Sequence, residues 1–454
     1  MRVASSLLLL CACLVGATWC QAQPALPIRC ADLSFEDEVL AGGGLYDGGT
    51  AMAQLAKAGL NTVRLRLWHT PGPGRDDLTD VLNAATRAEA LGLDVLLALH
   101  YSDTWADPGQ QTKPAAWASL SPNLLADSVY AYTRAVLTAL RDQGTPPRYV
   151  QLGNEVTGGM LWDTGRVGGM FDTPTQWAQL ATLLASSRAA VRDVLGDEAT
   201  VVVHIDRGGD LAGATWFFDR LRPLFDDFDM IGLSYYPWWH GDLDAFSATL
   251  DGLAARYGLP LFVAETAYPW TLGFVDDTNN LVGLPEQVLP GYPATPEGQA
   301  DFLAAVNGHV AAVADGGGLG VCYWAPDWIA APDFGSAWEN VALFDVQGHL
   351  LPAAAVLGGT SVDAAPTPPP AAALRVAVYP NPTTEAVIVT LDGPPGCGTV
   401  DVVDLLGRTR RDAEPICSGR PLRMHVGDWE AGVVALRIQW GAQQRTRLVV
   451  IAPR

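Results

Sequence analysis

Short apolar runs alternate with longer amphipathic segments from about residue 28 to residue 326. The apolar runs, which we interpret as strands, cover 28–34, 62–68, 94–101, 148–155, 200–205, 229–236, 259–267 and 318–326. Several of the segments between them show helical periodicity and end at a glycine, as helices commonly do. Strands that are apolar throughout are typical of parallel sheets buried on both faces. Eight strand–helix units therefore predict an α/β fold, a (β/α)8 TIM barrel.

An open, doubly wound sheet is the alternative for the same alternation. That fold normally carries a phosphate-binding G-x-G-x-x-G turn after an early strand. The glycine-rich segment GGGLYDGG at 42–49 precedes a helical pattern but lacks this spacing. The sequence therefore favours the barrel.

The C-terminal part of the chain follows a different pattern. Residues 359–373 are rich in proline and alanine and cannot form a core. From 374 to 454, short segments alternate apolar and polar positions, with turn residues between them, which predicts a small all-β sandwich. We expect a catalytic barrel domain over 23–358, a linker over 359–373 and a sandwich domain over 374–454.

Residues 1–22 have the form of a secretory signal peptide, with an apolar stretch from Leu7 to Val15 followed by small and polar residues. Cys20 raises a lipoprotein alternative, although bulky Trp19 occupies a position that normally requires a small residue. No later segment reaches the roughly 18 apolar residues of a membrane-spanning helix. We therefore predict an exported protein with no membrane span.

The chain is acidic, with a formal net charge of −21. Nucleic acids and anionic membrane surfaces are bound by clustered lysine and arginine, so this balance argues against both as partners. A neutral polymer or a small neutral ligand suits the composition better.

Export permits disulfide bonds. Cys397 and Cys417 share the C-terminal region, and we predict that they pair. Cys30 lies on the first predicted strand and Cys322 on the last, and these strands are neighbours in a closed barrel. For this second pair, the sequence allows either a disulfide or two reduced, buried cysteines.

Aromatic, amide and charged residues gather where the predicted strands end, which is where the active sites of such barrels lie. The candidates for substrate binding are Arg64, His100, Asp103, Trp105, Asn154, His204, Tyr235, Trp239, His240 and Trp324. Aromatic faces stack on sugar rings and polar groups bind hydroxyls, so the set suits a polysaccharide. The alternatives are an internal ion pair for Arg64 and a core position for His100 or His204.

Glu155 stands at the end of the fourth predicted strand and Glu265 near the end of the seventh, on opposite sides of an eight-stranded barrel. Glycoside hydrolysis needs one carboxyl group as acid and a second as nucleophile or base. Either glutamate alone would be read as a solvated or ion-paired side chain. Together they predict a catalytic pair, with Glu155 as acid of raised pKa and Glu265 as ionised nucleophile.

Metal chemistry has little support in the sequence. Asp276, Asp277 and Asn279 are calcium candidates, but the loop lacks the EF-hand spacing, and a solvated acidic loop is the alternative. There is no HExxH motif and no paired CxxC. We predict that no cofactor is required.

The ordered motifs GLNTVRLRLW, HYSDTWADPGQQTKPAAW, VQLGNEVTGGMLW, GLSYYPWWHG and ETAYPWT resemble glycoside hydrolase family 53, the arabinogalactan endo-β-1,4-galactanases. The resemblance implies a (β/α)8 barrel, a retaining mechanism and β-1,4-galactan of type I arabinogalactan as substrate. It further implies that Glu155 is the acid/base, Glu265 the nucleophile and Asn154 a ligand of the sugar 2-hydroxyl. Arg64, His100 and Tyr235 would support the subsite where the bond breaks.

The last strand departs from the family pattern, because YWAPDW has Ala325 where the family usually has glutamate. Near the C-terminus, VYPNPTTEAVIV and DLLG resemble the sorting domain of the type IX secretion system, which implies that this machinery is a partner. A carbohydrate-binding sandwich is the alternative.

The prediction is thus a bacterial, secreted or surface-attached retaining endo-galactanase. Its alternatives are the same barrel acting on another β-1,4-glycan and a non-catalytic galactan-binding protein.

Overall fold

The computed structural model describes residues 25–72, 76–359 and 375–452, except 380–382, 385, 393–396, 405–407, 418–419, 428, 430–431 and 441–442. The predicted signal peptide (1–22) lies outside the described residues, as does the predicted linker apart from Gly359. The chain divides into two compact units, Met1–Val362 and Asp363–Arg454. Within the described residues, no helix is both long enough and apolar enough to cross a membrane.

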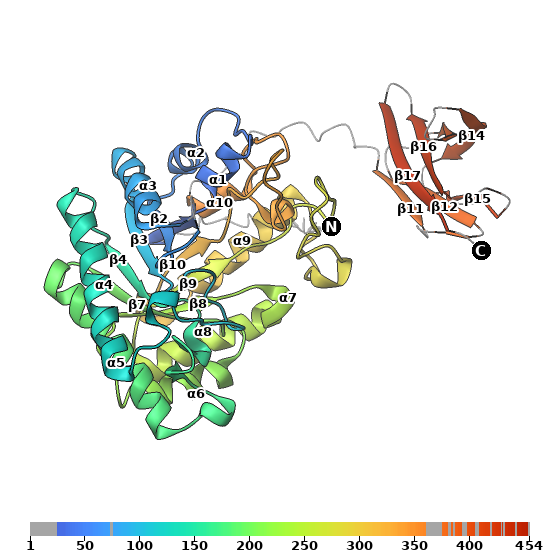
Figure 1. Ribbon diagram of the computed structural model, residues 1–454. Coiled ribbons are helices and arrows are strands. Elements are labelled where there is room, and N and C mark those ends of the chain that lie inside the picture. Colours follow the sequence, from blue (N-terminus) through green and yellow to red (C-terminus); the bar gives the residue numbers. More distant parts are fainter. Residues whose placement is uncertain are drawn as a thin grey trace, which may run out of the picture. The chain divides into compact units, whose positions relative to one another are not determined.

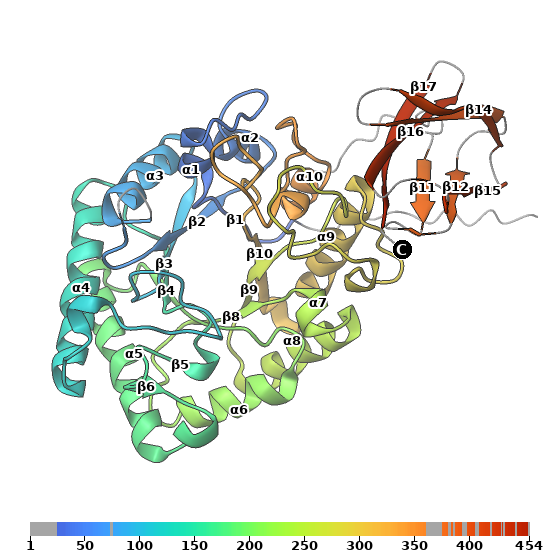
Figure 2. The same cartoon turned by 45° about the vertical axis from the view of Figure 1, so that its right-hand side comes forward.

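The first unit is a closed barrel of eight parallel strands with helices around it (Figures 1 and 2). The strands are β1 (Ile28–Asp32), β2 (Thr62–Leu67), β3 (Asp94–Leu99), β4 (Tyr149–Leu152), β7 (Thr200–Ile205), β8 (Met230–Ser234), β9 (Leu261–Thr266) and β10 (Gly318–Tyr323). Because β1 pairs with both β2 and β10, the sheet has no free edge. The barrel prediction is confirmed, and the open-sheet alternative is wrong.

The helices occupy most of the chain between the strands. They are α1 (Glu36–Ala41), α2 (Ala51–Lys57), α3 (Leu78–Ala90), α4 (Pro122–Asp142), α5 (Pro174–Leu195), α6 (Leu211–Leu221), α7 (Pro237–His240), α8 (Leu243–Tyr257), α9 (Pro296–Ala311) and α10 (Ala353–Leu357). Side chains that accept backbone N–H groups start several of them, such as Asp77 at α3 and Thr173 at α5. A short hairpin, β5 (Gly159–Met160) and β6 (Gly165–Arg166), follows β4.

Alternation along the strands divides the barrel interior into two layers. An apolar interior cluster contains Leu96 and Ala98 of β3 and Val202 of β7, whereas the residues between them pack outward against the helices. The same parity continues toward the C-terminal ends of the strands, where the interior positions are polar. These positions include Arg64, Gln151, His204 and Ser234, all of them buried. The polar layer thus packs directly on the apolar layer.

The second unit is all-β, as predicted. One sheet pairs β11 (Arg375–Tyr379), β12 (Ala386–Asp392) and β15 (Leu422–His425), and the other pairs β14 (Thr409–Cys417), β13 (Cys397–Asp404), β16 (Gly432–Trp440) and β17 (Gln443–Ile451). Its core is a separate apolar cluster built mainly of valine, leucine and isoleucine. The predicted disulfide between Cys397 and Cys417 joins β13 to β14.

A second disulfide, Cys30–Cys322, joins the first barrel strand to the last. The two cysteines are register partners on β1 and β10, and both are fully buried. Of the two possibilities open from the sequence, the disulfide is therefore the one present. It covalently fixes the seam at which the two ends of the barrel sheet meet.

We expect replacement of both Cys30 and Cys322 by serine to lower the free energy of unfolding of the barrel by about 5 kcal/mol, because the cross-link constrains a very long loop in the unfolded chain. The loop spans 292 residues. Chemical denaturation of the two proteins measures the difference. The matched control is serine at Cys397 and Cys417, which should leave the barrel transition in place. Equal barrel stability in all variants would contradict the prediction.

Candidate active site

The two glutamates reach the same cleft through local irregularities in the backbone. Glu155 has a left-handed conformation, with φ 47° and ψ 52°, which non-glycine residues uncommonly adopt. On β9, Phe262 and Ala264 face the barrel interior, so strict alternation would point Glu265 outward. A break in the β8–β9 pairing register, between Leu233 and Ser234 on β8, directs it into the cleft instead.

A cavity of about 620 Å³ opens between these glutamates at the C-terminal ends of the strands. Its lining combines the carboxyl groups with indole and phenol rings. The lining residues are His100, Trp105, Ala106, Asp107, Pro108, Asn154, Glu155, Asp206, Arg207, Tyr236, Trp239, His240, Glu265, Trp324, Trp328 and Trp338. Such a mixture offers flat apolar faces for sugar rings and donors and acceptors for their hydroxyls.

Glu265 is held by a cation and a phenol. Arg64 Nη2 lies 3.0 Å from Glu265 Oε1, and the Tyr236 hydroxyl donates to Oε2 over 3.0 Å. The guanidinium of Arg64 also donates to Asp32 Oδ2 and to Asn154 Oδ1, each at 2.7 Å. Arg64 is 1% exposed, so its charge is balanced almost entirely by these protein groups.

Glu155 has a different set of neighbours. Its Oε1 accepts a hydrogen bond of 2.6 Å from the Ser234 hydroxyl, whose oxygen also lies 2.9 Å from His204 Nε2. The other ring nitrogen of His204 lies 3.1 Å from Asn154 Oδ1. The Asn154 amide nitrogen donates to the carbonyl of Ala106 at 2.8 Å, which fixes the orientation of the amide.

The surroundings of the two carboxyl groups shift their pKa values to different extents. Burial raises the pKa of Glu155 well above its ordinary value, and the negative charges of Glu265 and Asp206 raise it further. Burial also raises the pKa of Glu265, but Arg64 opposes this shift and so does the hydrogen bond from Tyr236. Glu155 is therefore the glutamate that retains a proton, and Glu265 is the one placed to carry the negative charge.

The two histidines that line the cleft are neutral. Burial lowers the pKa of His240 to about 4, and His240 Nδ1 accepts the backbone N–H of Tyr236 at 2.9 Å. Burial and the nearby arginines hold the pKa of His100 well below its ordinary value. Neither ring therefore adds positive charge near the glutamates at neutral pH.

The structure brings most of the predicted site residues together. His100, Trp105, Asn154, Glu155, Trp239, His240, Glu265 and Trp324 line the cavity, while Arg64 and His204 lie buried next to them. Asp103 does not line it. Its carboxylate accepts the N–H groups of Thr70 and Ala115 and so holds a loop in place.

The prediction for Tyr235 is wrong. Its ring stacks on Phe246 with centroids 4.2 Å apart, and its hydroxyl donates to the carbonyl of Gly241, away from the cleft. Tyr236 is the tyrosine that reaches Glu265. Alternation along β8, on which Met230 and Ser234 face inward, points Tyr236 inward and Tyr235 outward, so strand parity favoured Tyr236, whereas Tyr235 was implied by the family resemblance.

Sequence reasoning also missed other groups at the site. Asp206 directly follows β7, at a predicted strand end, and Ser234 occupies an interior position of β8. Trp328 follows the eighth predicted strand directly and so stands at the predicted rim, whereas Trp338 lies in a segment without strand or helix periodicity and had no such signal.

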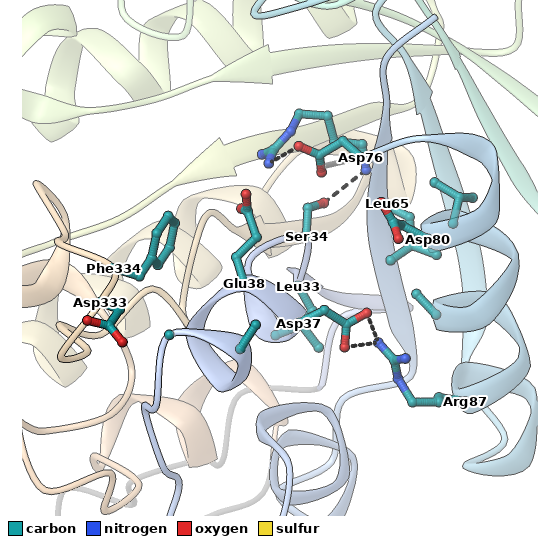
Figure 3. A pocket seen from close by; sticks show the side chains of 15 residues that line it. Leu33, Ser34, Asp37, Glu38, Leu65, Asp76, Asp80, Arg87, Asp333 and Phe334 are labelled. Atoms are coloured by element: carbon teal, nitrogen blue, oxygen red, sulfur yellow. Dashed lines mark hydrogen bonds and ion pairs between the residues drawn. The ribbon is translucent and has the colours of Figure 1, made fainter. Parts of the chain in front are cut away.

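A second cavity, of about 470 Å³, lies between α1 and α3 (Figure 3). Figure 3 shows the carboxylate of Asp37 joined to Arg87, and Asp76 forms an ion pair with Arg66. Asp80 accepts the backbone N–H of Asp77 at the start of α3. These carboxylates therefore serve the packing of α1, β2 and α3.

Calcium binding by Asp276, Asp277 and Asn279 stays a prediction. Among the described residues, no group of three or more histidine, cysteine, aspartate or glutamate side chains has the arrangement of a metal site. Asp276 accepts the backbone N–H groups of Thr278 and Ser336 with its two oxygens. The carboxylate of Asp276 thus joins the segment after β9 to the segment after β10.

Comparison with known proteins places the barrel in a family. Residues 46–357 match the family model described as Glycosyl hydrolase family 53. An uncharacterized protein encoded in the bgaB 5′ region of Niallia circulans is 44% identical over 331 residues, which cover 70% of this chain and 90% of that protein. An arabinogalactan endo-beta-1,4-galactanase of Thermothelomyces thermophilus is 35% identical, over 65% of this chain and 87% of that enzyme.

A solved structure and a second family model complete the comparison. The Ignisphaera aggregans GH53 catalytic domain superposes with a TM-score of 0.69 at 35% identity, covering 74% of this chain and 96% of that domain. Residues 377–452 match the model of a secretion system C-terminal sorting domain. The predicted sorting domain is confirmed, and with it export to the cell surface or the medium.

We expect Tyr236→Phe to lower kcat about 10- to 100-fold, because Glu265 loses a hydrogen bond made to its charged form. Tyr235→Phe is the matched control, since its hydroxyl donates to the Gly241 carbonyl, and kcat should change less than threefold. Steady-state kinetics of the two variants on a soluble glycan gives the answer. Equal losses in both would refute the assignment of Tyr236 to the site.

Proposed function

The chain belongs to glycosyl hydrolase family 53, and we propose that it is a secreted, endo-acting, retaining galactanase that cleaves β-1,4-galactosidic bonds of type I arabinogalactan. The observation that carries the proposal is the pair Glu155 and Glu265. The two carboxyl groups line one cleft, and their surroundings favour opposite protonation states. A retaining glycosidase needs this combination of a protonated acid and an ionised nucleophile.

In the first step, Glu265 attacks the anomeric carbon while Glu155 gives its proton to the departing glycosidic oxygen. The C–O bond breaks, and a covalent glycosyl–enzyme forms at Glu265. Arg64 and Tyr236 hold the two oxygens of Glu265, so its orientation is set before the substrate arrives. In the second step, Glu155 accepts a proton from water, which displaces Glu265 and restores both carboxyl groups.

Asn154 and the tryptophans supply substrate contacts. The Asn154 amide donates one hydrogen to Ala106, which leaves its second hydrogen for a sugar hydroxyl beside the reacting carbon. Trp105, Trp239 and Trp324 offer faces for stacking along the cleft, and Trp239 is 56% exposed. Stacking faces that come from different strand ends suit several successive sugars of a polymer, which supports endo action.

The choice of galactan rests on the relatives. The enzyme of Thermothelomyces thermophilus and one of Cellvibrio japonicus, 37% identical over 342 residues, both bear the name arabinogalactan endo-beta-1,4-galactanase. The same barrel acting on mannan or glucan is the nearest alternative. A non-catalytic galactan-binding protein is less compatible with the site, because binding alone does not need two facing carboxyl groups of opposed protonation.

We expect Glu155→Gln and Glu265→Gln to differ in how they depend on the leaving group. Both should lose at least 1,000-fold in kcat on galactan, on the order of the loss seen when a central catalytic group is removed. A dinitrophenyl galactoside needs no proton from the enzyme, so Glu155→Gln should still form the glycosyl–enzyme from it, whereas Glu265→Gln should not. Mass spectrometry detects the intermediate. Its absence from Glu155→Gln, or its presence in Glu265→Gln, would overturn the assigned roles.

Substrate class and stereochemistry can be tested together. We expect reducing sugar to be released from β-1,4-galactan, with at least tenfold lower rates on β-1,4-mannan and β-1,4-glucan, because each wrong hydroxyl leaves polar groups of the cleft unpaired. Proton NMR of the first product should show the β-anomer before mutarotation. Activity restricted to mannan or glucan would refute the substrate, and an α-anomer would refute retention.

A further inference from the structure

The hydrogen bonds around Asn154 determine which nitrogen of His204 carries a proton. The amide nitrogen of Asn154 faces the carbonyl of Ala106, so the side chain presents its oxygen to the barrel interior. That oxygen accepts from Arg64 and Gln151 and lies 3.1 Å from His204 Nδ1. Because an amide oxygen cannot donate, the hydrogen must be on Nδ1.

His204 has no means of carrying a second proton. Burial holds its pKa well below the ordinary value, and the positive charge of Arg64 lowers it further. The ring is 0% exposed. A neutral ring with its hydrogen on Nδ1 has a bare lone pair on Nε2, which faces the Ser234 hydroxyl at 2.9 Å.

Ser234 therefore has two acceptors and one hydrogen. Its oxygen lies 2.9 Å from His204 Nε2 and 2.6 Å from Glu155 Oε1, and the side chain is fully buried. When Glu155 is protonated, Glu155 donates to Ser234 and Ser234 donates to His204, so all three groups are satisfied. When Glu155 is ionised, Ser234 turns its hydrogen to the carboxylate, and Nε2 is left buried without a donor.

We propose that Ser234 and His204 act as a proton switch that favours the acid form of Glu155. The inference rests on the proposed role of Glu155 as acid/base and makes both residues positioning residues, since neither touches the substrate. The switch stores no proton itself. The hydrogen of the Ser234 hydroxyl changes its acceptor between His204 Nε2 and Glu155 Oε1. The direction of the Ser234–Glu155 hydrogen bond, and whether Nε2 has a donor, depend on this change.

The proton count closes over the catalytic cycle. In the first step the Glu155 proton leaves with the glycosidic oxygen, and the Ser234 hydrogen turns from His204 to Glu155. In the second step Glu155 takes a proton from the attacking water, and the Ser234 hydrogen turns back to His204. The unsatisfied Nε2 in the glycosyl–enzyme state thus favours the return of a proton to Glu155.

Other charges also face Glu155 and must be separated from the switch. Glu265 and Asp206 raise its pKa, whereas Arg64 lowers it. Tyr236 hydrogen-bonds to Glu265, and Arg207 and His240 line the same cavity. None of these groups contacts the Ser234 hydroxyl through a recorded hydrogen bond, so substitutions at His204 and Ser234 address the switch and leave those charges in place.

The direct test is the 15N chemical shift of His204 in protein labelled at histidine, without substrate. Ring nitrogens with and without a proton differ strongly in this shift. We expect Nδ1 to remain protonated at all pH values, and Nε2 to shift in one step toward the value of an unbonded nitrogen as Glu155 ionises. In Glu155→Gln, whose amide can donate to Ser234 permanently, the Nε2 shift should not vary with pH.

The kinetic test uses His204→Asn, which places an N–H donor near the former Nδ1 and removes the acceptor that faced Ser234. Ser234 can then donate to ionised Glu155 without loss, so the pKa of Glu155 falls. Since the acid must be protonated, the decrease of kcat/KM with rising pH should begin at a lower pH than in the native enzyme. The alkaline limb should shift down by about one unit, a tenfold change in the ionisation constant.

The same His204→Asn change in a Ser234→Ala background should not move the alkaline limb, because the switch acts through the serine hydroxyl. Circular dichroism and thermal melting identify any variant that fails to fold. The pH titration of the 15N shift in the native chain needs a variant only to assign the His204 signals. A pH-independent Nε2 shift in the native chain, or equal limb shifts in both backgrounds, would overturn the switch. Because the shift is read without substrate, its failure is distinct from a lack of galactanase activity.

Discussion

The buried guanidinium of Arg64 is the constraint on which the upper layer of the barrel depends. It contacts Asp32 of β1, Asn154 after β4 and Glu265 of β9, and so joins three strands that are far apart in the sequence. A buried cation is unfavourable unless it is paired and hydrogen-bonded. Loss of any partner would leave this charge uncompensated. The relative positions of Asn154 and Glu265 are therefore set by a shared ion rather than by the loops that follow their strands.

The same cation explains how two identical side chains acquire different chemistry. Glu265 lies against Arg64 and accepts a hydrogen bond from Tyr236, which compensate part of the cost of its burial as an anion. Glu155 has only a neutral hydroxyl and lies near two other carboxylates, so its ionised form is disfavoured. The difference in protonation between Glu155 and Glu265 originates in the side chains that surround each strand end. It does not require any difference between the glutamates themselves.

Period-two alternation explains which parts of this site the sequence could predict. Within regular strands, parity places Arg64 and His204 inside the barrel, and the strand count places Glu155 and Glu265 across from each other. Prediction fails where regular pairing stops. Alternation alone would point Glu265 outward, because the extra residue that breaks the β8–β9 register has no signal in the sequence. The error at Tyr235 has another cause, since parity along β8 favours Tyr236 and the family resemblance implied Tyr235. The Cys30–Cys322 disulfide could not be predicted from local pattern, because the first and last strands are neighbours only when the whole sheet closes.

The charges around the cleft also bear on the kind of polymer that can enter it. Asp107, Glu155, Asp206 and Glu265 line the cavity, whereas Arg207 is the cationic side chain among its lining residues, and the lining histidines are neutral. A uronate-rich polymer would bring further negative charge into a partly buried, acidic site and would be repelled. A neutral galactan carries no such penalty and gains from the tryptophan faces. The negative charges of Glu265 and Asp206, which add to the effect of burial on the pKa of Glu155, thus also disfavour the entry of an anionic glycan.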